Sequence, residues 1–245
     1  MIYHFKTLGS SNDEAQGEQY RHGDVIVAER QTAGRGQRGN KWLSGEGLNL
    51  TLSAVLATDQ FEARDQFVVL QGVALAICDV LSEYGLTPQI KWTNDIYIGD
   101  KKIAGILLEN RLSGGMLVRS VAGVGLNVNQ RDFDESLPNP TSILIESGRQ
   151  VERGRLLESL SAAIVSRFES LATEQGRERA IADYHSLLYR VGVFHTFRLS
   201  DSGQQRVGRI CGVATQGELI VEWECGEKCS YLFKEIDFVI EARCR

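Results

Sequence analysis

Apolar residues recur along the chain with two different periods, which separate the predicted strands from the predicted helices. Alternation with a period of two, or a short continuous apolar run, predicts strands at 2–7, 24–29, 48–57 and 116–128. Helical spacing predicts helices at 67–84, 153–173 and 177–188, the first ending at Gly85. Residues 10–14 are typical of another helix start, because hydroxyl and Asn side chains precede acidic ones. Residues 90–98 and 102–110 predict a β-hairpin.

The pattern changes after Gly192, where helical periodicity gives way to short strands. These are predicted at 194–199, 206–213, 218–223, 229–233 and 236–241. Their spacing is typical of a small β-barrel. We therefore expect an α+β protein with two domains, residues 1–190 and residues 191–245.

Composition and charge narrow the functional classes. The 245 residues are 42% hydrophobic and carry a formal net charge of −5, which disfavours a general nucleic-acid binder. We see no apolar run of membrane-spanning length and no signal-peptide core, so we expect a cytoplasmic protein without a membrane partner. Five cysteines disfavour a disulfide framework. Free thiols are favoured over a zinc site formed by Cys211, Cys225, Cys229 and Cys244.

A glycine-rich loop between the second and third strands is the first candidate site. Its sequence, Q-T-A-G-R-G-Q-R-G-N-K-W, covers residues 31–42. Glycine permits close backbone approach to a ligand, and arginine supplies planar donors that match carboxylate and phosphate. The loop is therefore a candidate anion-binding site, and a flexible surface loop with solvated arginines is the alternative, which the motif taken alone favours.

The predicted hairpin carries the second candidate site, K-W-T-N-D-I-Y-I-G-D-K-K-I-A-G-I-L-L-E at residues 91–109. If residues 90–98 form one strand, Lys91, Thr93 and Asp95 share a face, and Trp92 and Asn94 share the other. Lys102 would hold two anions together, and Asp95 would orient Lys102 or hold Mg²⁺. The alternative is an exposed hairpin tip with ordinary turn charges.

The third candidate is G-V-G-L-N-V-N at residues 123–129, at the end of an apolar strand. Asn127 and Asn129 would share one face and offer both donors and acceptors to a nucleotide. A plain strand end with turn residues is the alternative.

Together, in this order, the three segments resemble the biotin–protein ligase family. The family pattern joins a Gly-Arg-Gly loop ending in Trp to a K-W-P-N-D hairpin and a G-[IV]-G-[IL]-N segment, and this chain has GRGQRGNKW, KWTNDIY, KKIAGILLE and GVGLN. Ser10-Ser11-Asn12 stands at the S-T-N triplet of the family, and residues 140–143 resemble a later element. The resemblance implies a mixed-sheet catalytic domain like class II synthetases and lipoate ligases, with an SH3-like C-terminal barrel.

The resemblance also implies residue roles. Biotin would be bound by Ser10, Ser11, Asn12, Gln31, Arg35, Gly36, Gln37 and Lys102. ATP or the adenylate would be bound by Arg38, Asn40, Trp42, Asn94 and Asn127. Lys102, Arg35 and Asp95 would carry the catalysis, with Asp95 as the candidate Mg²⁺ ligand.

Three positions depart from the family pattern. Ser11 replaces Thr and keeps the hydroxyl, and Thr93 replaces Pro. Gln37 stands where many members carry Arg, so retention of the adenylate would rest more on Arg35 and Lys102.

The implied activity is activation of biotin by ATP to biotinyl-5′-AMP, then transfer to a lysine of a biotin carboxyl carrier domain. A lipoate–protein ligase is the first alternative. A biotin-responsive DNA-binding repressor is the second, and it is disfavoured because the Ser-Ser-Asn triplet at position 10 leaves no room for a preceding DNA-binding domain. A homodimer through sheet edges is compatible with the family.

Overall fold

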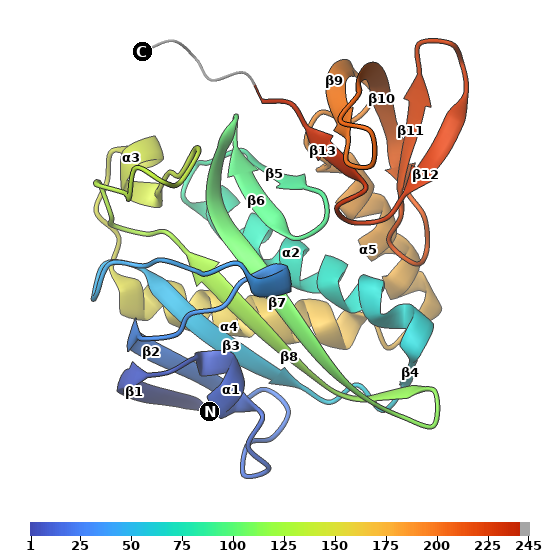
Figure 1. The fold of residues 1–245 in the computed structure, drawn as a ribbon. Helices are drawn as coiled ribbons and strands as arrows, with labels where there is room; N and C mark the ends of the chain where they lie inside the picture. The colour runs from blue at the N-terminus through green and yellow to red at the C-terminus, as the bar shows by residue number, and fades with distance from the viewer. Residues whose placement is uncertain (241–245) are drawn as a thin grey trace.

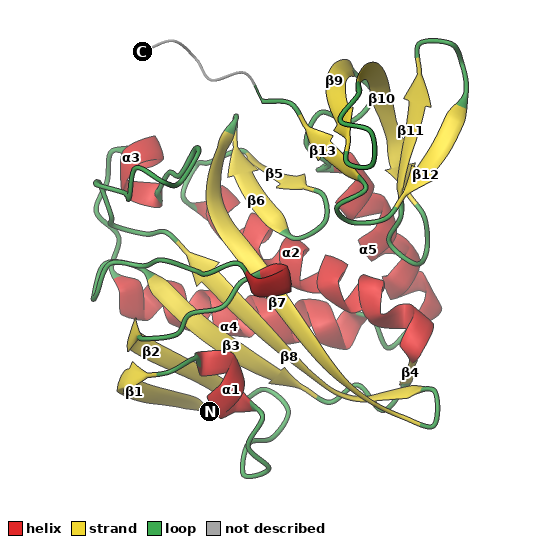
Figure 2. Cartoon of the chain, in the orientation of Figure 1, coloured by secondary structure: helices red, strands yellow, loops and turns green. Residues whose placement is uncertain are grey.

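The computed structural model describes residues 1–240, with Arg38 described by its backbone alone. A large mixed sheet stands in front of three long helices, and a smaller sheet lies at one end (Figures 1 and 2). The strands of the large sheet are β1 (Ile2–Leu8), β2 (Val25–Gln31), β3 (Leu50–Leu56), β4 (Phe61–Glu62), β5 (Pro88–Lys91), β6 (Asp95–Ile98), β7 (Lys101–Ser113) and β8 (Met116–Leu126).

The large sheet has the order β1-β2-β3-β8-β7-β6-β5, and β4 pairs with β8 beside this path. β1 and β2 pair in parallel, whereas the other neighbours pair antiparallel. The long β7–β8 pair forms the middle of the sheet and places Gly105 opposite Gly125 and Leu107 opposite Gly123. This face of the sheet becomes the floor of the site.

The helices are α1 (Ser11–Ala15), α2 (Gln66–Glu83), α3 (Ile143–Ser147), α4 (Arg153–Ser170) and α5 (Glu174–Ser186), with 3-10 turns η1 (Gln37–Gly39) and η2 (Ala63–Asp65). α2 is apolar around most of its circumference because it lies between the sheet and helices α4 and α5 (Figure 1). Gly85 follows its C-terminus with a φ of 76°, as the sequence predicts.

The expectation that no apolar run reaches membrane-spanning length is wrong for residues 63–83. That helical segment is long and apolar enough by length and composition. In this structure 78% of its apolar window is buried inside the protein, so it serves as a core helix here.

The second sheet has the order β12-β11-β10-β9-β13 and is antiparallel throughout. Its strands are β9 (Phe194–Leu199), β10 (Gln205–Val213), β11 (Leu219–Trp223), β12 (Lys228–Tyr231) and β13 (Ile236–Phe238). The α+β class with a small C-terminal β-unit is confirmed, whereas the division at residue 190 into two domains stays a prediction. Cys211, Cys225 and Cys229 are free thiols, and Cys244 lies outside the described residues.

The prediction of one strand over 90–98 is wrong. The chain turns back after Lys91, so β5 and β6 are antiparallel neighbours with Lys91 opposite Asp95. Period-two alternation therefore does not place Lys91, Thr93 and Asp95 on one face. Asn94 instead fixes the turn, since its side-chain nitrogen donates to the Ile106 carbonyl at 2.6 Å.

Candidate active site

A cavity of about 310 Å³ lies over the β7–β8 floor, beneath the glycine-rich loop. Most of the predicted site residues line it: Ser10, Ser11, Asn12, Gln31, Arg35, Gly36, Gln37, Asn40, Trp42, Asn94, Asp95 and Lys102. Residues far apart in the sequence thus meet around one space. The side chain of Arg38 lies outside what the structure describes.

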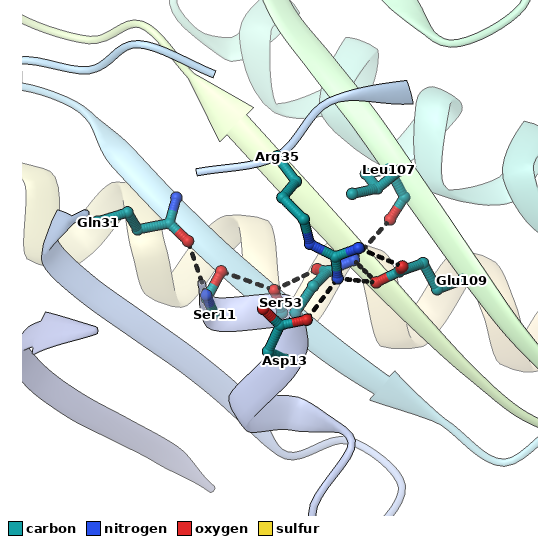
Figure 3. Close-up of polar contacts among 8 residues, drawn as sticks. Ser11, Asp13, Gln31, Arg35, Ser53, Leu107 and Glu109 are labelled. Carbon is teal, nitrogen blue, oxygen red and sulfur yellow. Dashed lines mark hydrogen bonds and ion pairs between the residues drawn. The ribbon is translucent and has the colours of Figure 1, made fainter. Parts of the chain in front are cut away.

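The polar end of the cavity lies at the start of α1. Ser10 occupies the N-cap position without a side-chain capping bond, so its hydroxyl is not used to cap the helix. The buried Ser53 hydroxyl donates to the Asn12 side-chain oxygen at 2.6 Å and lies 2.8 Å from the Ser11 hydroxyl. The Ser11 amide donates to Gln31 at 2.6 Å (Figure 3). A buried, pre-ordered set of donors and acceptors results.

Arg35 reaches this end from the glycine-rich loop. Its guanidinium donates to both Glu109 carboxylate oxygens, at 2.9 and 2.8 Å, and to Asp13 at 2.6 Å (Figure 3). The hydrogen bond to Glu109 is the main cause of a raised pKa of Arg35. Glu109 also accepts from the Asn12 amide at 2.9 Å, so one carboxylate connects the loop to α1.

Glycines make room for the side chains that lie on the floor. A Cβ at Gly125 would come within 2.2 Å of Trp42, and one at Gly123 within 2.2 Å of Asn12. The Trp42 indole therefore lies directly against the β8 backbone. Its Nε1 is buried and has no hydrogen-bond partner among the described residues, which is uncommon for a buried donor.

Lys102 stands in the middle of the cavity, between the floor and the turn at 91–95. Its ammonium lies 2.7 Å from the Asp95 carboxylate and 5.7 Å from the centroid of the Trp42 ring. A Cβ at Gly105 would lie 3.3 Å from Nζ, so the glycine also accommodates the lysine. Asp95 thereby orients Lys102, as one of the two sequence interpretations expects.

The end of the cavity beside the second sheet includes residues that were not predicted from the sequence. Lys91 lies there with its Nζ 5.1 Å from the ring centroid of Phe238 in β13, and burial lowers the pKa of this lysine. The second sheet contributes further lining residues: Phe233, Lys234, Ile236, Asp237 and Phe238. The cavity is thus built from both sheets.

Asn127 does not line the cavity. Its side chain is buried and donates to the Thr141 carbonyl at 2.9 Å, which holds the segment before α3 against the end of β8. A contact between Asn127 and a nucleotide stays a prediction.

Comparison with known proteins decides the family. Residues 6–127 match the model of the biotin/lipoate A/B protein ligase family. A biotin–acetyl-CoA-carboxylase ligase of Mycobacterium tuberculosis is 30% identical over 208 residues, which cover 82% of this chain and 73% of that protein. The chain belongs to the biotin–protein ligase family.

Two further members of the family are similar to this chain. The bifunctional ligase/repressor BirA of Escherichia coli is 33% identical over 204 residues, covering 82% of this chain. This alignment spans only 62% of BirA. The solved structure of a biotin protein ligase from Aquifex aeolicus in complex with biotin and ATP superposes with a TM-score of 0.81 at 26% identity. It covers 98% of this chain and 99% of that one.

Within this family member, sequence reasoning missed Ser53, Glu109 and Asp13 as parts of the site. A signal for Ser53 was present, because Asn49, Thr51 and Ser53 alternate with apolar residues and so place polar groups on one face of the third strand. Glu109 ends the K-K-I-A-G-I-L-L-E segment, but only the fold brings it to Arg35.

Proposed function

We propose that this protein activates biotin with ATP to biotinyl-5′-AMP and transfers the biotinyl group to a lysine of a biotin carboxyl carrier domain. The observation that carries the proposal is the buried polar cluster of Ser11, Asn12 and Ser53 in the same cavity as Lys102. The ureido ring of biotin has donors and an acceptor, which such a cluster can match inside a closed pocket. The Aquifex relative with biotin and ATP supports the same ligands.

In this proposal Ser10, Ser11, Asn12 and Gln31 bind the biotin ring. Arg35, Gly36 and Gln37 cover it from the loop, which shields the adenylate from water. Trp42 and Asn40 contact the adenosine, with Arg38, Asn94 and Asn127 as further proposed nucleotide contacts. Glu109 keeps Arg35 in place because it holds the guanidinium through two hydrogen bonds.

Lys102 holds the carboxylate of biotin against the α-phosphate. Both groups are anionic, so their repulsion opposes the reaction, and a fixed ammonium between them lowers that barrier. The biotin carboxylate oxygen attacks the α-phosphorus and pyrophosphate departs with the bond electrons. The acceptor lysine then attacks the acyl carbon and AMP departs, so no nucleophilic side chain of this chain is needed.

A magnesium ion would further neutralise the phosphates. In proteins Mg²⁺ commonly uses one or two carboxylates together with phosphate oxygens. Asp95 and Asp237 are the carboxylates that line the cavity, so the described residues fit such a site with Asp95 as the proposed ligand.

The decisive test incubates the protein with biotin, Mg-ATP and a purified carrier domain, and then probes for protein-bound biotin. The Lys102→Ala variant is the control. Absence of biotinylated carrier with active pyrophosphate release would limit the function to adenylation, and absence of both would refute the proposal.

Lipoate is the competing substrate. The dithiolane ring of lipoate lacks the hydrogen-bonding groups of a ureido ring, so it would gain no hydrogen bonds from the polar groups around Ser53. We therefore expect biotin to be strongly preferred when the two compete in a pyrophosphate-release assay.

We also propose a cytoplasmic location and a homodimer for this protein. The free thiols of Cys78, Cys211, Cys225 and Cys229 are compatible with the proposed cytoplasmic location. β1 lies at one edge of the large sheet and would allow a homodimer through strand pairing, which sedimentation analysis tests.

A further inference from the structure

The turn between β12 and β13 forms one wall of the cavity and is held firmly against the catalytic sheet. Trp92 packs edge-on against Phe233 of this turn at 6.0 Å, and its indole nitrogen donates at 2.8 Å to the Gly217 carbonyl in the neighbouring connection between β10 and β11. The next residue, Lys234, lines the cavity together with Asp237 and Phe238. The second sheet therefore brings a cation to a site that the large sheet does not complete alone.

The backbone of Lys234 adopts a conformation that lysine rarely takes. Its φ is 76°, and Lys234 is one of two non-glycine residues with positive φ among the described residues. The turn is closed around it, because the Leu232 amide donates to the Glu235 carboxylate at 2.8 Å and the Glu235 amide to the Leu232 carbonyl at 3.0 Å. Glycine would suit this position better, so a lysine here is unusual and its side chain is a candidate for a functional role.

Two of the other cations along the cavity already face carboxylates. Lys102 is paired with Asp95, and Arg35 is paired with Glu109 and Asp13. Lys91 is largely buried, and its ammonium lies 5.4 Å from the Tyr97 ring and 5.1 Å from the Phe238 ring. Lys234 and Lys41 are exposed, and the side chain of neither makes an ion pair or hydrogen bond with another described residue. Lys41 belongs to the glycine-rich loop, whereas Lys234 belongs to the same end of the chain as Phe238, which Lys91 contacts.

Lys102 alone cannot neutralise the negative charge of a triphosphate. Its ammonium is already paired with the Asp95 carboxylate, and it would also contact the biotin carboxylate. Lys91 and Lys234 lie beside the same strand, β13, at the end of the cavity away from the Ser11–Asn12 cluster. A lysine acts on phosphate as a point charge with rotatable donors.

We propose that Lys234 binds the β- and γ-phosphates of ATP and then the departing pyrophosphate, with Lys91 beside it. This inference rests on the proposed function and extends it to the leaving group. When the biotin carboxylate oxygen bonds to the α-phosphorus, the bond from that phosphorus to the bridging oxygen breaks. The electron pair stays on the pyrophosphate oxygen, and the Lys234 ammonium lowers the energy of that charge without transferring a proton.

The test compares Lys234→Ala, Lys234→Gly and Lys234→Arg with the parent. Lys228→Ala is the matched control, because Lys228 is an exposed lysine of the same sheet that pairs with Glu222 and does not line the cavity. For the Ala and Gly variants, we expect about a tenfold rise in the KM for ATP and in the pyrophosphate concentration that inhibits adenylation. Lys234→Arg should keep most of the effect, and Lys228→Ala should match the parent.

Two features make the result decisive. Lys234→Gly relieves the strained backbone, so its melting temperature should equal or exceed that of the parent, and weaker phosphate binding in this variant cannot come from unfolding. Transfer from preformed biotinyl-5′-AMP to the carrier should be unchanged, since that step involves no pyrophosphate. A KM for ATP and a pyrophosphate inhibition within twofold of the parent in both variants would overturn the inference.

A failure of the proposed ligase function can be distinguished from a failure of the proposed phosphate site. If the parent released no pyrophosphate from biotin and ATP, calorimetric titration with magnesium pyrophosphate would still test Lys234. Weaker binding to Lys234→Gly than to the parent supports the phosphate site, and equal binding overturns it.

Discussion

Gly125→Ala should weaken nucleotide binding through Trp42. A Cβ at residue 125 would lie 2.2 Å from the Trp42 Cε2, whereas ordinary contact begins at 3.4 Å. The indole must therefore retreat by about 1.2 Å. β8 is a central, hydrogen-bonded strand, whereas Trp42 belongs to a loop, so we expect the loop to move and the strand to stay.

The size of the effect follows from what Trp42 is proposed to do. Stacking of a base on an aromatic ring contributes about 1–3 kcal/mol, and each 1.4 kcal/mol corresponds to about tenfold in affinity. Loss of stacking should raise the KM for ATP about tenfold or more in the pyrophosphate-release assay. The KM for biotin should change less, because Ser11 and Asn12 do not touch the substituted position.

Gly17→Ala is the matched control. Its Cβ would also meet an atom closely, at 2.4 Å, but that atom is the end of the flexible Gln19 side chain. A double-mutant cycle with Trp42→Ala isolates the cause, since Gly125→Ala should add nothing once the indole is gone. A parental KM for ATP in Gly125→Ala, or an undiminished effect in the Trp42→Ala background, would refute this reasoning.

Three further predictions concern the charges of the site. Lys102→Ala should abolish most pyrophosphate release while the melting temperature stays near that of the parent, because the side chain is partly exposed; near-parental release would contradict its role. Glu109→Gln should raise the KM for biotin and ATP about tenfold through loosening of Arg35, whereas Glu62→Gln, which alters an exposed pair with Arg64, should not. Gln37→Arg should slow the escape of biotinyl-5′-AMP in a filter or rapid-dialysis assay, and equal escape would show that Arg35 and Lys102 suffice.

The fold was largely predictable where the pattern is local. Helical spacing located α2 and α4 within a few residues, and the strand at 194–199 coincides with β9. Alternation failed at 91–95, because polar residues in a tight turn have the same spacing as polar residues on a strand. Only the pairing of Lys91 with Asp95 distinguishes the two, and pairing is a non-local property.

The sequence predicted which residues belong to the site better than it predicted how the fold arranges them. Motifs identified Ser10–Asn12, Arg35 and Lys102, because the residue types and their spacing indicate what these side chains can bind. The glycines at 123 and 125 read as turn residues, although their use is to let Asn12 and Trp42 approach the sheet. Phe233 and Lys234 could not be assigned, because they reach the cavity through non-local packing of the second sheet, for example against Trp92 and Lys91.

The shared wall of the cavity has a consequence for how the protein is made. A chain leaving the ribosome has all strands of the large sheet once residue 126 has emerged, and the helices that cover it by residue 186. The turn that carries Phe233 and Lys234 comes more than forty residues later. The proposed phosphate end of the cavity is thus assembled after the proposed biotin end, so a nascent chain that lacks this turn should bind ATP more weakly than the full chain.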